Sequence, residues 1–306
     1  MSQKLYLSAS PHIRAANTTQ SIMRDVIISL IPATLAGVVI FGLRSLLVVA
    51  VCIISALLSE GLFNVAIRKK QTIGDLSAVV TGLLLALNLP ANVPLWQAAV
   101  GTVFAIVVVK CAFGGLGCNF VNPAITARVF MLVSFGSMAQ AAFPVDAVST
   151  ATPLAELGAG VMPEFFGLFF GNVGGCIGET CVPALLLGFA YLLFRKVISW
   201  HIPVTFILTV FVLTFAITGF DASVAMAYVL SGGLFLGAVF MATDYVTSPS
   251  TTKGKVIFGI GCAVITTLIR FYGNYPEGVS FAILLMNILN PYIESWSKRK
   301  VFGGAA

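Results

Sequence analysis

The stretch Asp146-Ala-Val-Ser149-Thr150-Ala-Thr152-Pro lies within the longest polar interruption of this chain, which runs from about Ser137 to Pro163. The interruption contains no Lys, Arg or His, and its hydroxyl side chains stand close together in the quoted stretch. Long apolar segments lie on both sides of it. The sequence therefore predicts an apolar scaffold that presents this polar loop on one side.

The composition indicates the class of protein to which the apolar segments belong. Of the 306 residues, 58% are hydrophobic and 9% are charged, and the mean hydropathy is +1.02. A soluble domain carries about 25% charged residues, so a membrane protein with several spans is the class that fits. Without the tails and the loop, roughly 260 residues remain, enough for about ten spans of about 20 residues with short turns. We therefore expect an all-α polytopic membrane protein with about ten transmembrane helices.

Polar and basic boundaries divide the apolar sequence into these spans. Before the loop we expect spans at about 22–42, 45–66, 76–89, 95–109 and 124–135. After the loop we expect a span ending at 195, then 202–219 and 223–242, one ending at 270, and 278–293. The segment from Phe165 to Gly175 is too short to cross and is broken by glycines, which favours a re-entrant or interfacial piece.

The basic residues predict the orientation of the spans. With the N-terminus inside, most Lys and Arg fall on the inner side, whereas Arg44 and Arg270 lie at outer ends and Arg128 lies within a span. This positive-inside bias places both termini in the cytoplasm and the polar loop on the outer face. It also accounts for the net charge of +6 without nucleic-acid binding. Glu60 in the second span could pair with Arg128, because charges within the membrane need partners.

Two parts of the chain resemble each other weakly. The segment from Thr81 to Asn88, followed by Pro94, matches the segment from Gly237 to Asp244, followed by Pro249. The offset of five spans is odd, so the copies have opposite orientations, and inverted repeats place polar sites at their interface. Chance similarity in an apolar chain is the alternative. The expected organisation is an N-terminal arm (1–20), a first membrane repeat (21–136), the outer loop with the re-entrant segment (137–175), a second membrane repeat (176–297) and a cytoplasmic tail (298–306).

Polar residues at the ends of spans are candidates for ligand contact. Asn119 and Asn122 lie in a glycine-rich turn that enters the fifth span, and their amides suit the edge of a planar heterocycle. Helix capping by Asn122 explains the same pattern. Asp244 ends the eighth span and could bind a cofactor N–H or serve an ion path, or it could simply face water. Two histidines and six scattered cysteines without a CxxC pair predict neither a metal site nor a soluble-type catalytic set.

The hydroxyl group of Thr152 allows two interpretations. A plain hydroxyl is a poor nucleophile without a base, and the loop contains no histidine, which argues against catalysis by the loop itself. An exposed loop is accessible to another enzyme that could modify it. Composition by itself favours an ordinary Ser/Thr loop over a modified one.

The quoted stretch resembles a known modification motif. Asp146-x-x-Ser149-Thr150-Ala151-Thr152 is similar to the flavinylation motif Asp-x-x-Ser/Thr-Gly-Ala-Thr, although Thr150 stands where Gly is usual. By this motif and four others the chain resembles the RnfD/NqrB family of bacterial ion-pumping redox complexes over nearly its whole length. The other motifs are Ser10–Arg14, Thr81–Leu87, Gly117–Ala124 and Phe240–Pro249. The short N-terminal arm is similar to the RnfD branch rather than to the NqrB branch.

The resemblance implies a subunit of a complex in the bacterial inner membrane that moves electrons between ferredoxin and NAD and couples this to Na⁺ or H⁺ transport. It implies FMN on Thr152 as a phosphoester, with Ser149 and Asp146 as further motif residues. It implies a second, noncovalent flavin, usually riboflavin, beside Asn119, Asn122 and Asp244. The implied partners are a flavin transferase, membrane lipid and the other Rnf subunits, including a second flavinylated subunit and iron–sulfur subunits.

Two other functions fit parts of the sequence. A subunit of a quinone-reducing Na⁺ pump would share the family, but the chain length argues against it. A solute channel or carrier would suit inverted repeats of five spans equally well. The flavinylation motif discriminates against the carrier, since a carrier has no use for it on an outer loop.

Overall fold

The computed structural model describes residues 18–136, 142–144, 152–273 and 278–298. Within these ranges the regular secondary structure is helical, apart from one isolated β-bridge between Ala142 and Gly175. Asp146 and Ser149 lie outside the described residues, as do the terminal arm up to residue 17 and the tail from residue 299.

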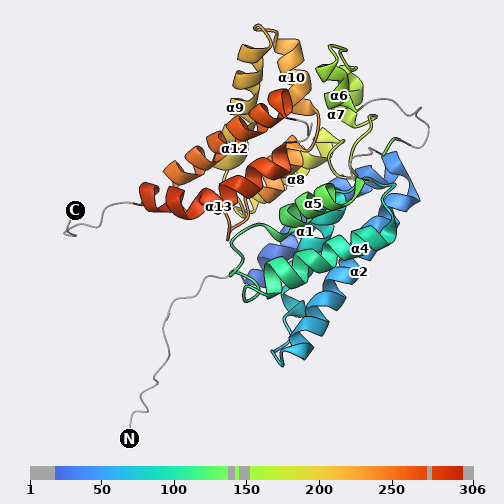
Figure 1. Ribbon diagram of the computed structural model, residues 1–306, viewed down its shortest axis with the longest axis vertical. Helices are drawn as coiled ribbons and strands as arrows, with labels where there is room; N and C mark the ends of the chain where they lie inside the picture. Colours follow the sequence, from blue (N-terminus) through green and yellow to red (C-terminus); the bar gives the residue numbers. More distant parts are fainter. Residues whose placement is uncertain (1–17, 137–141, 145–151, 274–277, 299–306) are drawn as a thin grey trace, which may run out of the picture.

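The helices form two halves, which a short helical segment joins in the sequence (Figure 1). The first half contains α1 (Thr19–Phe41), α2 (Leu43–Ala66), a 3₁₀ turn (Ile73–Asp75), α3 (Ser77–Leu87), α4 (Leu95–Val103), which continues as a π-helix (Phe104–Cys111), and α5 (Pro123–Ser134). The segment between the halves contains α6 (Pro153–Gly158) and α7 (Phe165–Phe170). The second half contains α8 (Val182–Phe194), α9 (His201–Ile217), α10 (Ala222–Leu230), α11 (Leu234–Leu236), which continues as a π-helix (Gly237–Met241), α12 (Thr252–Tyr272) and α13 (Val279–Ser297).

The all-α polytopic class is confirmed, whereas the count of ten spans stays a prediction. In the described ranges, α1, α2 and α12 are long and apolar enough to cross a bilayer one by one. The pair formed by α10 and 234–241 adds a fourth span if its two bent parts count as one. The five remaining apolar segments, of 10–17 residues, are α3, α4 with its π-helix, α5, α8 and α9.

The eighth expected span is wrong as a continuous helix. The helix α10 ends at Leu230, a new helix begins at Leu234, and the two are bent by 65° relative to each other. Gly232 has φ +69°, a conformation that glycine adopts without the strain of a side chain. The glycine pair therefore interrupts the helix where hydropathy alone predicted continuity.

Helices of the two halves pack in the same order. In the first half α2 packs against α3 and α4, and in the second half α9 packs against α10 and α12. Likewise α4 contacts α5, and α12 contacts α13. Across the halves, α1 packs on α8 and α5 packs on α13, so first helix meets first helix and fifth meets fifth. The order of contacts is therefore similar in the two halves, and the inverted repeat itself stays a prediction.

The contact between α1 and α8 depends on a glycine. A Cβ atom at Gly188 would lie 2.2 Å from the backbone oxygen of Ser29 and 2.9 Å from Cζ of Phe240. Small residues at such positions let membrane helices approach closely. We expect Gly188→Ala to lower the melting temperature of the purified protein, because overpacking costs about 1–3 kcal/mol.

A glycine in open space provides the matched control for this substitution. Gly158 lies in α6, and an added Cβ there would meet nothing within 4 Å. Gly158→Ala should therefore leave the melting temperature unchanged or slightly raised. Equal melting temperatures for the two variants would show that α1 and α8 do not pack this closely.

Candidate functional site

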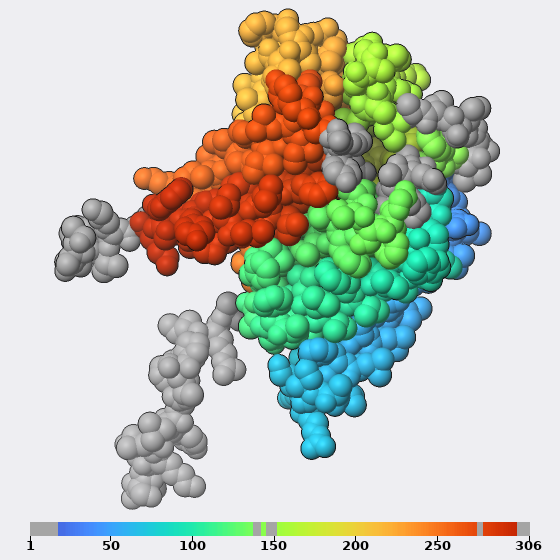
Figure 2. Space-filling view, viewed as in Figure 1, coloured from blue at the N-terminus to red at the C-terminus, as the bar shows by residue number. Residues whose placement is uncertain are grey.

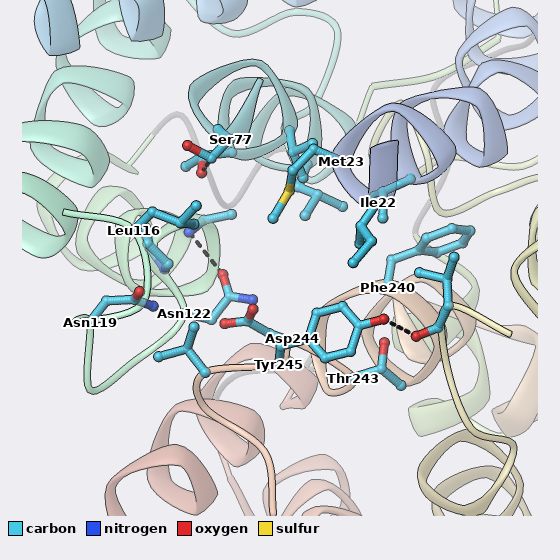
Figure 3. A pocket seen from close by; sticks show the side chains of 18 of the residues that line it. Ile22, Met23, Ser77, Leu116, Asn119, Asn122, Phe240, Thr243, Asp244 and Tyr245 are labelled. Atoms are coloured by element: carbon cyan, nitrogen blue, oxygen red, sulfur yellow. Dashed lines mark hydrogen bonds between the residues drawn. The ribbon is translucent and has the colours of Figure 1, made fainter. Parts of the chain in front are cut away.

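A cavity of about 850 Å³ lies at the interface of the two halves. Ile22 and Met23 of α1 line one side, and Phe240 closes it from the second half (Figure 3). Asn119, Asn122 and Asp244 also line the cavity, so the structure brings together the three polar residues that the sequence singled out.

Asn122 has a structural role at this cavity. Its Oδ1 accepts hydrogen bonds from the N–H groups of Ala124 (3.0 Å) and Ile125 (3.4 Å), which makes it the N-cap of α5. Its Nδ2 donates to the backbone oxygen of Met241 at 3.2 Å. The capping interpretation of Asn122 is therefore confirmed, and the same side chain fastens the two halves together beside the cavity.

Asn119 keeps more of its hydrogen-bonding capacity for a ligand than Asn122 does. The side chain is buried, and its Nδ2 donates to the backbone oxygen of Val121 at 3.0 Å. An amide has acceptor as well as donor capacity, so Oδ1 of Asn119 can accept a hydrogen bond from a group in the cavity.

Asp244 contributes the carboxylate of the cavity. Burial raises the pKa of Asp244 above its usual value. Hydrogen bonds from the Thr247 hydroxyl (3.0 Å) and from the N–H groups of Val246 and Tyr245 act in the opposite direction. Because desolvation is the larger cause, Asp244 binds a proton more readily than an exposed carboxylate does. It can therefore accept a hydrogen bond when ionised and donate one when protonated.

A buried ion pair next to the cavity was missed by the sequence analysis. Lys110, which lines the cavity, lies with Nζ 3.0 Å and 3.1 Å from the two carboxylate oxygens of Glu60. The same Nζ donates to Oγ of Ser77 at 2.6 Å, and the Ser77 hydroxyl donates to Asp75. Lys110 was expected on the inner surface, but it is 2% exposed. The apolar run immediately before it was the signal that could have indicated burial.

The expected pair between Glu60 and Arg128 is wrong. Glu60 pairs with Lys110, because the π-helix of α4 packs against α2 and carries the ammonium group to the carboxylate. Arg128 of α5 is also buried, and its Nη2 lies 3.4 Å from Sγ of Cys176. Spacing along the sequence could not decide between the two cations, since the choice depends on which helices are neighbours.

Thr152 is the one described residue of the three that the flavinylation motif singled out. It is half-buried, and its Oγ1 accepts a hydrogen bond from the N–H of Ala155 at 3.3 Å as the N-cap of α6. The helices α6 and α7 pack against α10, where Leu154 and Leu157 join a small apolar cluster with Tyr228. Figure 2 shows this segment, in yellow-green, against the second half. The segment that carries Thr152 is thus anchored on α10, apart from the cavity.

These features define a class: a multi-pass helical membrane protein with a polar-edged cavity between two similarly packed halves. The chain belongs to the NQR2, RnfD, RnfE family, whose sequence pattern matches residues 6–303. It is 50% identical to the D subunit of the Na(+)-translocating ferredoxin:NAD(+) oxidoreductase complex of Acetobacterium woodii, over 98% of this chain and 95% of the relative.

Two further relatives show the range of similarity. The D subunit of the proton-translocating ferredoxin:NAD(+) oxidoreductase complex of Clostridium ljungdahlii is 41% identical, over 97% of this chain and 96% of the relative. The D subunit of the ion-translocating oxidoreductase complex of Halorhodospira halophila is 34% identical, over 97% and 95%. The family resemblance inferred from the motifs is confirmed.

Proposed function

We propose that this chain is the electron-carrying membrane subunit of an ion-translocating ferredoxin:NAD⁺ oxidoreductase. In this function it holds one flavin in the cavity between the halves and a covalent FMN on Thr152. The observation that supports the proposal is the cavity, because apolar walls with Asn119, Asn122 and Asp244 at the interface of the halves suit a planar redox cofactor with a polar edge. The names of the relatives, which are subunits of such complexes, support the same function.

The residues present fit a flavin in the cavity. Apolar side chains of Ile22, Met23 and Phe240 can cover the faces of a flat ring system. Asn119 and Asp244 offer hydrogen-bonding groups for its polar edge. Lys110 also lines the cavity, where the Glu60 carboxylate balances its charge.

The local structure also suits a modified Thr152. The side chain is half-buried at the start of α6, so its oxygen can be reached by another enzyme. A bound flavin supplies one- and two-electron chemistry, and the chain supplies its position. Thr152 would fix one flavin at the segment on α10, whereas the cavity residues would hold the second flavin between the halves. A covalent bond prevents loss of this flavin between electron transfers.

The proposal includes the expected surroundings of the chain. It lies in a bacterial cytoplasmic membrane with both termini inside and the Thr152 segment on the outer face, as the distribution of basic residues indicates. Its partners are a flavin transferase and other subunits of the complex, among them a second flavinylated subunit and iron–sulfur subunits. Charge added by an electron in a low-dielectric interior is costly, and movement of a cation compensates for it.

Substitution of Asn119 tests the noncovalent flavin. We expect wild-type protein to release about one flavin per chain on acid precipitation. Asn119→Leu should bind that flavin about tenfold to a hundredfold more weakly, because a hydrogen bond lost from a buried polar edge costs about 1–3 kcal/mol. Asp244→Asn should weaken it as well. The measurement is chromatography of the released flavin across a riboflavin titration.

An asparagine outside the cavity is the control. Asn92 is exposed, so Asn92→Leu should retain the wild-type flavin content. Wild-type protein without released flavin, or an unchanged affinity in both cavity variants, would remove the cavity from the electron path. If covalent flavin were absent too, a solute channel or carrier would be the better explanation.

A further inference from the structure

Asn287 is a polar side chain buried within the apolar helix α13. It is 1% exposed. An amide that leaves water costs free energy unless its donor and its acceptor both find partners, and in membrane proteins such side chains form hydrogen bonds between helices. The described lining of the cavity does not include Asn287. Its hydrogen-bond partners therefore indicate its role.

The amide of Asn287 binds one backbone group in each half of the molecule. Its Nδ2 donates to the backbone oxygen of Thr247 at 3.2 Å, and its Oδ1 accepts from the backbone N–H of Asn122 at 3.1 Å. The reverse orientation of the amide would place oxygen against oxygen and N–H against N–H, so the hydrogen bonds fix this orientation. These contacts lie where α13 packs on α5, whose N-cap is Asn122.

Thr247 links Asn287 to the carboxylate of the cavity. The side chain of Thr247 is 2% exposed, and its hydroxyl donates to Oδ2 of Asp244 at 3.0 Å. The N–H and the hydroxyl of Ser248 both donate to the backbone oxygen of Asp244, at 3.1 Å and 2.7 Å, so residues 244–248 form one tight turn. Asn287 therefore binds the backbone of the residue whose hydroxyl holds Asp244.

The same network holds the chain on the other side of Asp244. Met241 ends the π-helix, where backbone oxygens lack partners within the helix, and Nδ2 of Asn122 donates to its backbone oxygen at 3.2 Å. Asn287 in turn accepts from the N–H of Asn122. The segment from Met241 to Thr247 is thus bound at both ends, and Asp244 lies between them. Both Asn122 and Asp244 face the cavity (Figure 3).

We infer that Asn287 is a positioning residue for Asp244. It holds the turn that presents the carboxylate to the polar edge of the ligand, without lining the cavity itself. A hydrogen-bonding group that is already ordered binds a ligand more tightly than one that becomes ordered on binding. The inference rests on the proposed function, because it takes the ligand of the cavity to be a flavin. It extends that function to a residue of α13.

Riboflavin titration of the full-length chain in detergent, followed by riboflavin fluorescence, tests this role. Every sample carries Thr152→Ala, so that only noncovalent flavin is measured. Asn287→Leu should raise the Kd for riboflavin about tenfold, because a misplaced Asp244 loses a hydrogen bond to the ligand. Thr247→Val removes the hydroxyl that binds Asp244 and should also raise the Kd. It provides the test if Asn287→Leu does not fold.

A double-mutant cycle with Asp244→Ala distinguishes positioning from a general loss of stability. In the Asp244→Ala background, Asn287→Leu should raise the Kd less than about threefold, because no carboxylate remains to be positioned and coupled residues are not additive. A merely structural role of Asn287 would give the same tenfold rise with and without the carboxylate. The same comparison applies to Thr247→Val.

Asn290→Leu is the matched control, because Asn290 lies about one turn further along α13 and is not part of the described cavity lining. It should retain the Kd of the reference chain. If the reference chain binds riboflavin and Asn287→Leu and Thr247→Val bind it equally well, the inference is overturned and the proposed function stands. Additive effects of Asn287→Leu and Asp244→Ala would overturn it as well. A reference chain that binds no riboflavin would overturn the cavity flavin of the proposed function, and this inference with it.

Discussion

Thr152→Ala is expected to abolish the covalent flavin of this chain completely. The wild type, produced together with an active flavin transferase, should give a fluorescent band under ultraviolet light after full denaturation. The variant band should be dark, because the substitution removes the oxygen that forms the phosphoester. In-gel fluorescence distinguishes this flavin from the one in the cavity, since a noncovalent flavin is lost on denaturation.

A substitution at a second N-cap threonine distinguishes loss of the covalent flavin from the loss of stability that removal of a helix cap causes. Thr251 is the N-cap of α12, and its Oγ1 accepts a hydrogen bond from the N–H of Gly254 at 3.0 Å, as Thr152 does from Ala155. Thr251→Ala should lose about 1 kcal/mol of stability, as loss of a cap does, and yet remain fluorescent. A dark wild-type band with an active transferase would contradict the proposal and point to Thr150. Restoration of fluorescence by Thr150→Gly would confirm that explanation.

Hydropathy predicted the elements of the fold well because it is a property of long segments. Each expected span has a helical counterpart, and most ends differ by a few residues. The break at Ser231–Gly233 was missed, because a glycine pair within a membrane helix is compatible with continuity or interruption. Packing against Leu154 and the carbonyl contacts of Arg270 stabilise the broken form. Those partners come from distant parts of the sequence.

Some candidate residues were predictable from local sequence, whereas others depend on contacts with distant parts of the chain. Asn122 was predictable because an N-cap before Pro123 is a local pattern. Its place in a cavity with Asn119 and Asp244 was expected from the family resemblance and is what the structure shows. Asn287 gave no signal, because its role depends on hydrogen bonds to Asn122 and Thr247, which lie in other parts of the sequence. A lone asparagine in an apolar span indicates a contact between helices, but not the partners of that contact.

Lys110→Met is expected to destabilise the protein by about 3–5 kcal/mol, because it leaves the Glu60 carboxylate buried without its cation. Both side chains are 3% exposed, so water cannot replace the lost partner. The measurement is the free energy of unfolding of the purified chain, by titration with denaturant in detergent. The ammonium group also binds Ser77, and its loss disconnects the carboxylate from the wall of the cavity.

Two comparisons separate a buried ion pair from a general effect of removing a charge. Arg195 pairs with Asp25 at 3.1 Å, and its side chain is 44% exposed whereas that of Asp25 is 7% exposed. Because water reaches the Arg195 end of the pair and the Tyr191 hydroxyl also donates to Asp25, Arg195→Met should cost less than Lys110→Met. The double variant Glu60→Gln/Lys110→Met should recover most of the loss, because it removes both charges and keeps an acceptor for the Thr72 hydroxyl. Equal losses in Lys110→Met and Arg195→Met would show that the Glu60 carboxylate reaches water. In that case Lys110 would contribute its charge to the cavity without holding the helices together.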